Sequence, residues 1–91
     1  MSNVITGIEA VRQARGIIKC DETKIILTTV LVQENTCVTL YEFLGDFYFS
    51  SLPDNINLSI FEKITREEAE KMVSDIKGLS RIGTYFEFGG F

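Results

Sequence analysis

Residues 36–52, TCVTLYEFLGDFYFSSL, carry the pattern from which the fold of this chain is predicted. Gly45 and Asp46 stand near the middle, and glycine accepts the positive φ that the first position of a type II′ turn requires. A two-residue turn there predicts a β-hairpin in which Leu44 pairs with Phe47. Residues before and after the turn are rich in β-branched and aromatic side chains, which strands favour.

The two faces of this hairpin are both largely apolar. Side chains alternate between the faces of a strand, so the predicted register assigns each residue to one face. One face holds Val38, Leu40, Leu44, Phe47 and Phe49. The other holds Cys37, Thr39, Tyr41, Phe43, Tyr48 and Leu52. Because a large exposed apolar patch is unusual on a monomer, the sequence predicts that something covers each face.

Further strands flank the hairpin on both sides. Residues 24–32, KIILTTVLV, are β-branched and too short for a buried helix. A turn at Glu34-Asn35 joins them to the hairpin, and a loop one residue longer would exchange the faces. The alternation over residues 56–60 predicts a half-exposed strand near a sheet edge, and residues 81–88 predict a last strand.

Two helices are predicted from their N-terminal capping patterns. Thr6 and Glu9 fit a capping box, and the first helix is expected to end near Gly16. Thr65 and Glu68 fit a second capping box. The second helix then carries a stripe at helical spacing, formed by Ala69, Met72, Val73 and Ile76.

These elements predict one α+β domain over residues 1–91, with residues 89–91 as a short C-terminal tail. The expected order is α-β-β-β-β-α-β. The sheet is an antiparallel meander of about five strands, with an N-terminal helix and a second helix before the last strand.

The 91 residues contain few of the side chains that enzymes commonly use as general bases or nucleophiles. There is no histidine, so the commonest general base and any Ser-His or Cys-His pair are absent. Cys20 and Cys37 fit no common zinc spacing. We therefore expect no enzyme activity, no catalytic residue, no metal and no cofactor.

Charge and hydropathy limit the kinds of partner and the cellular locations that we expect for this chain. Residues 25–62 contain no Lys or Arg but five acids, and the formal net charge of the chain is −4. Such a segment repels phosphates, so we expect no nucleic-acid binding. The sequence has neither a long apolar run nor a secretory-signal pattern, which predicts a cytoplasmic protein with free thiols and no membrane contact.

The second apolar face leaves two alternatives open. The helices cover opposite faces, or both helices cover one face and leave the other as a binding or dimer surface. The tyrosines favour the second alternative, because they combine apolar area with a polar tip. Acids at predicted turns suit contact with a basic partner. The expected partner-binding residues are Tyr41, Phe43, Tyr48, Glu34, Asp46 and Asp54.

A small acidic chain without catalytic equipment is typical of a protein-interaction module. We expect a homodimer or a complex with another protein, with the aromatic sheet face as the docking surface. A small inhibitor or regulator of a larger protein, of the kind that bacteriophages carry, fits this size and acidity. The alternative is a small-molecule-binding domain or a carboxylate-dependent enzyme with a pocket between sheet and helices. Glu42 distinguishes the two, because a buried Glu42 that lines a pocket favours the alternative.

Overall fold

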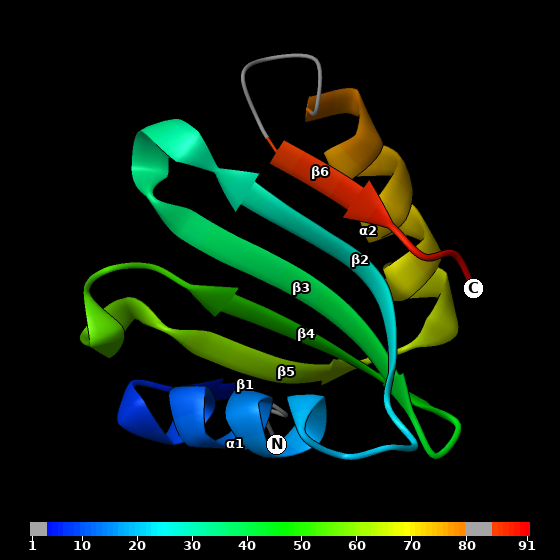
Figure 1. The fold of residues 1–91 in the computed structure, drawn as a ribbon, viewed down its shortest axis with the longest axis horizontal. Coiled ribbons are helices and arrows are strands. Elements are labelled where there is room, and N and C mark those ends of the chain that lie inside the picture. Colours follow the sequence, from blue (N-terminus) through cyan, green and yellow to red (C-terminus); the bar gives the residue numbers. More distant parts are fainter. Residues whose placement is uncertain (1–3, 80–84) are drawn as a thin grey trace.

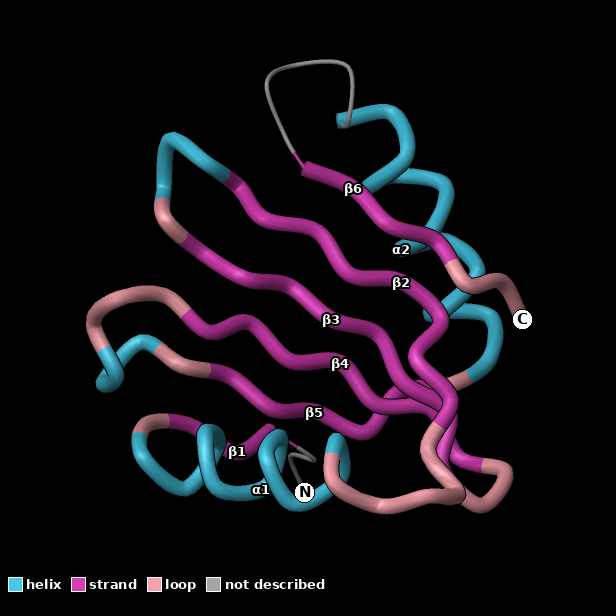
Figure 2. Tube along the Cα trace, in the orientation of Figure 1, coloured by secondary structure: helices cyan, strands magenta, loops and turns pink. Residues whose placement is uncertain are grey.

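The computed structural model describes residues 4–79 and 85–91, which form an α+β fold with a six-stranded antiparallel sheet (Figure 1). Its two α-helices are α1 (Ile8–Ile18) and α2 (Arg66–Leu79). The strands are β1 (Val4–Thr6), β2 (Lys24–Leu31), β3 (Thr36–Phe43), β4 (Asp46–Leu52), β5 (Ile60–Ile64) and β6 (Tyr85–Phe88). Along the sheet their order is β1-β5-β4-β3-β2-β6, and Figure 2 follows it from edge to edge.

The central hairpin of β3 and β4 exists, but its turn lies one residue earlier than predicted. Phe43 pairs with Asp46, and the turn residues are Leu44 and Gly45, with φ angles of 51° and 86°. Two positive φ angles are typical of a type I′ turn rather than type II′. The pairing shifts by two residues, so each strand residue keeps its predicted face.

The β2–β3 connection is longer than the predicted two-residue turn. A short 3-10 turn, η1 (Val32–Glu34), is followed by Asn35 in the left-handed region. Leu31 therefore pairs with Thr36, and Leu27 pairs with Leu40 on the expected face. An irregularity between Ile25 and Leu27 places Ile25 opposite Tyr41, on the other face.

The prediction of a strand at residues 56–60 is wrong. Residues 56–58 form a 3-10 turn, η2 (Ile56–Leu58), and β5 begins only at Ile60. The Asn55 side chain accepts a hydrogen bond from the Asn57 backbone N–H at 3.1 Å. This local bond offers the backbone an alternative to strand pairing.

The N-terminal capping prediction is also wrong. Thr6 lies in β1, a strand that the sequence did not indicate, and pairs with Ile60 of β5. Gly7, at φ 71°, turns the chain into α1 without a side-chain cap. The helix continues through Gly16 to Ile18, because the packing of its buried face outweighs the local glycine signal.

The capping prediction for α2 is confirmed. The Glu68 backbone N–H donates to Thr65 Oγ1, and the Thr65 backbone N–H donates to Glu68 Oε1, both at 3.1 Å. The predicted last strand is present as β6 over residues 85–88, and residues 80–84 lie outside the described part of the chain.

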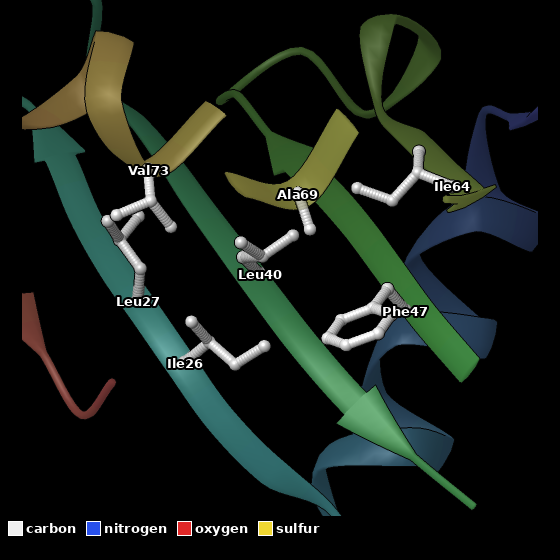
Figure 3. Packing of buried hydrophobic residues seen from close by; sticks show 7 residues of the cluster. All are labelled: Ile26, Leu27, Leu40, Phe47, Ile64, Ala69 and Val73. Atoms are coloured by element: carbon white, nitrogen blue, oxygen red, sulfur yellow. The ribbon is translucent and has the colours of Figure 1, made fainter. Parts of the chain in front are cut away.

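The two helices cover opposite faces of the sheet (Figure 1), so the favoured alternative, in which both helices cover one face, is wrong. Tyr48 packs in the cluster beneath α1, whereas its neighbour Phe49 packs in the cluster beneath α2. Consecutive strand residues point to opposite faces, so the helices cannot share one face. In Figure 3, α2 residues point toward sheet residues; the cluster drawn there is Ile26, Leu27, Leu40, Phe47, Ile64, Ala69 and Val73.

The C-terminal residues 89–91, expected as a tail, lie against the domain. The Gly89 and Gly90 backbone N–H groups donate to the Ile26 carbonyl at 2.8 and 3.2 Å. A Cβ atom at Gly89 would stand 2.6 Å from a backbone oxygen of β2, so only glycine fits there. The Phe91 ring meets the Phe47 ring edge-on at 6.0 Å between centroids.

A buried hydroxyl between η2 and β5 leads to a prediction about stability. Ser59 is 1% exposed, and among the described residues its Oγ has no hydrogen-bond partner. Because an unpaired buried hydroxyl costs desolvation energy, we expect Ser59→Ala to raise the free energy of unfolding by about 1 kcal/mol. Chemical denaturation at neutral pH measures the change.

Ser50→Ala is the matched control for this prediction. Ser50 is equally buried, but its Oγ shares a hydrogen bond with the Tyr41 hydroxyl at 2.7 Å. Its removal takes away that hydrogen bond, so we expect a loss of about 1 kcal/mol. The same direction of change in both variants would contradict the assignment of Ser59 as unsatisfied.

Candidate interaction surface

The α1 face of the sheet is only partly covered. Ala10 and Ala14 of α1 pack against Phe61 of β5, beside the half-buried Tyr48 and Leu52. The covered strands are thus β1, β5 and β4. Figure 1 shows α1 along this edge of the sheet, with no helix in front of β2, β3 and β6.

The uncovered part of this face forms an apolar surface over β2 and β3. Ile25 is 45% exposed, and Thr28, Val30, Cys37 and Phe43 are half-buried, whereas Thr39 and Tyr41 on the same face are buried. Cross-strand pairs place them together: Val30 lies opposite Cys37, and Thr28 opposite Thr39. None of them is charged. We define the open surface as Ile25, Thr28, Val30, Cys37 and Phe43.

Two of the three predicted aromatic contact residues do not belong to the open surface. Tyr41 is fully buried, so it is not available to a partner. Burial raises the pKa of the Tyr41 hydroxyl, and hydrogen bonding to Ser50 opposes that shift. The Tyr48 ring stacks on Phe61 at 5.4 Å in the cluster beneath α1. Phe43 alone remains partly exposed on the uncovered strands.

The three predicted acidic contact residues lie at opposite ends of the molecule. Asp46, at the β3–β4 turn, forms an ion pair with Lys63 at 3.6 Å. Glu34 and Asp54 lie on the β2–β3 and β4–β5 connections, at the other end of these strands. The Asn35 side-chain amide donates a hydrogen bond to Asp54 and joins these two connections.

A shallow hollow of about 200 Å³ adjoins the open surface between β2 and β6. Its lining consists of Ile25, Thr28, Glu87, Phe88 and Gly89. Small-molecule sites commonly measure roughly 300 to 1,000 Å³, so this hollow is smaller than a typical ligand pocket. Glu42 is half-buried opposite Lys24 and does not line the hollow.

The two thiols and the acids form no metal site in the described part of the chain. Cys20 and Cys37 are free cysteines, and Cys20 Sγ lies 3.3 Å from the Gly16 carbonyl oxygen. Within residues 4–79 and 85–91, no three His, Cys, Asp or Glu side chains are grouped so that they could hold a metal ion. Cys37 instead contributes a small apolar side chain to the open surface.

Several exposed apolar residues were missed by the sequence reasoning. Ile56 and Leu58 are 48% and 64% exposed, although their alternation predicted that they form the apolar side of a half-exposed strand. Asn55 and Asn57 interleave with them, and asparagine is typical of turns. That pair of asparagines was the available signal for η2 and for its exposed side chains.

Comparisons of the chain with protein-family models, with curated proteins and with solved structures found no match. No helix among the described residues combines the length and apolar character that crossing a membrane requires.

Proposed function

We propose that this chain is a non-enzymatic protein-interaction module that forms a homodimer through the open surface. The observation that carries the proposal is the uncovered, uncharged part of one sheet face, over β2 and β3. Exposed apolar patches often mark interaction sites, and β-branched side chains pack well on a flat sheet. The occupant we infer is a second copy of the chain.

The distribution of charge supports a second copy as the occupant. None of the five side chains of the open surface is charged, and the acids on the same face, Glu87 opposite Thr28 and Asp46 opposite Phe43, stand at its edges. Glu87 of β6 is exposed at the margin, where a polar rim is expected. Glu34 and Asp54 lie on loops beyond the ends of the strands, away from the proposed contact.

The size of the surface sets the expected strength of the dimer. Two strands about 4.8 Å apart, each with about six residues at roughly 3.4 Å, give a footprint of roughly 200 Å². A standard interface buries about 800 Å² per partner. We therefore propose a weak dimer that dissociates on dilution.

The remaining parts of the proposal concern the kind of activity and the location. The hollow between β2 and β6 is smaller than typical ligand sites and leaves Glu42 outside, so within the described residues it supports an interaction module over a small-molecule site or a carboxylate-dependent enzyme there. Free Cys20 and Cys37 support a reducing, cytoplasmic environment. A role as a small acidic inhibitor or regulator of a larger protein fits the length and charge.

Val30→Lys tests the dimer. Val30 lies on the open surface, and a lysine there would have to be desolvated between two sheets. Light scattering at increasing concentration should show the wild-type mass rising from 10.3 kDa toward twice that value. The variant should need at least about tenfold higher concentration to associate.

Val32→Lys is the matched control for Val30→Lys. Val32 is 60% exposed in η1, outside the open surface, so its replacement should leave association unchanged. Circular dichroism verifies that both variants are folded. A wild-type mass that stays at 10.3 kDa at millimolar concentration, or equal effects of the two lysines, would refute the dimer.

A further inference from the structure

The end of the molecule that carries η1 and η2 exposes three large apolar side chains. Val32 is 60% exposed, Ile56 is 48% exposed and Leu58 is 64% exposed. All three belong to connections between strands, where polar residues are the usual choice. Exposed apolar side chains that gather at one end of a molecule are typical of a contact site for another molecule.

The two connections are joined at this end. Figure 1 shows the β2–β3 and β4–β5 connections at the same end of the sheet, opposite the β3–β4 turn. The Asn35 side-chain amide donates to the Asp54 carboxylate and links them. We define the end surface as Val32, Ile56 and Leu58, with the acids Glu34 and Asp54.

Local hydrogen bonds hold the η2 part of the end surface in shape. The Leu58 backbone N–H donates to the Asn55 carbonyl at 2.9 Å, and the Ser59 backbone N–H donates to the Ile56 carbonyl at 3.0 Å. The exposure of Ile56 and Leu58 is therefore a property of an ordered turn. A surface that is ordered before binding loses less entropy when a partner arrives.

The charged residues of the two connections are both acidic. Glu34 and Asp54 are exposed, and no Lys or Arg occurs between residues 25 and 62. On the neighbouring helix, Arg12 is paired with Glu9 at 3.5 Å. A negative, partly apolar surface attracts positive charge and repels both nucleic acid and a second copy of itself.

We propose that the end surface binds a basic amphipathic segment of another protein, with the apolar residues of the segment on Ile56 and Leu58 and its Lys or Arg side chains beside Glu34 and Asp54. The inference shares the interaction-module function but does not require the dimer, because it uses a different surface. In a dimer formed through the open surface, each copy would present one end surface.

A synthetic amphipathic helical peptide of Leu and Lys is the probe. Its titration into isotope-labelled wild-type protein should shift the backbone amide resonances of residues 32–35 and 53–58 in a saturable way. A peptide of Leu and Glu in the same order should not bind. A peptide of Lys and Ser should bind at least about tenfold more weakly, because it lacks the apolar contact.

Ile56→Ser and Ile25→Ser form a matched pair for the same titration. Ile56 and Ile25 have similar exposure, 48% and 45%, but lie on the end surface and the open surface respectively. Ile56→Ser should weaken the binding of the Leu-Lys peptide about fivefold, while Ile25→Ser should leave its affinity unchanged.

The outcomes separate the two proposals. Absent binding, equal losses in the two serine variants, or a Lys-Ser peptide that binds as tightly as the Leu-Lys peptide would overturn the end surface as a docking site. Light scattering of the same samples without peptide reports the dimer independently. A monomeric protein that still binds the peptide through residues 32–35 and 53–58 would overturn the dimer alone.

Discussion

Leu40→Ala should lower the free energy of unfolding by about 3 kcal/mol. Leu40 is fully buried in the middle of the sheet, in the cluster that joins β2, β3, β4 and α2. In Figure 3 it lies between Leu27 and Phe47, facing Ala69 of α2. Removal of its outer carbons takes apolar contacts from both the sheet and the helix, and leaves a cavity that rigid strands cannot close.

Leu44→Ala provides the control, because it deletes the same atoms four residues away. Leu44 is 72% exposed in the β3–β4 turn, so we expect a change within about 0.5 kcal/mol. Urea denaturation followed by circular dichroism measures both variants. Similar losses at the two positions would contradict the assignment of Leu40 to the core and of Leu44 to the turn.

The contrast between Leu40 and Leu44 also shows what the sequence could predict. Alternation alone assigns Leu40 to a buried face, and a register that slips by two residues preserves that assignment. Alternation does not predict the position of the turn in this way. The second turn residue beside Gly45 can be either Leu44 or Asp46. Leu44 takes a φ of 51°, which a non-glycine residue adopts at a modest cost when the surrounding strands require it.

The candidate surfaces were harder to predict than the core. The extent of the open surface depends on where α1 lies, and α1 is placed by β1, a three-residue strand paired with β5. Nothing in so short a segment distinguishes a strand from the start of the helix. The sequence predicts that Glu34 and Asp54 lie at turns, but their meeting at one end depends on the tertiary contact through Asn35.

Tyr41 should make the stability of the protein sensitive to alkaline pH. Its side chain is fully buried, and its hydroxyl shares a hydrogen bond with Ser50 Oγ at 2.7 Å. Desolvation by burial raises the pKa of this hydroxyl above the value of about 10 that tyrosine has in an unfolded chain. The folded state therefore keeps a proton that the unfolded state loses.

Because the folded state holds the Tyr41 proton more tightly than the unfolded state, stability should fall as pH rises above about 10. Below pH 10 both states are protonated, and the folded state keeps the full contribution of Tyr41. As pH rises from about 10 toward the folded pKa, the unfolded state binds fewer protons, so the free energy of unfolding falls. The slope that one tyrosine adds is at most about 1.4 kcal/mol per pH unit.

Tyr41→Phe separates this contribution from the other alkaline effects. At pH 8 the variant should be less stable by about 1 to 2 kcal/mol, because Ser50 Oγ loses its partner. Above pH 10 the wild type should lose stability more steeply than the variant, so the two curves converge. Denaturant midpoints between pH 8 and pH 11.5 measure both. Parallel curves over that range would mean that Tyr41 ionises as readily in the folded state as in the unfolded state, which its burial within the sheet opposes.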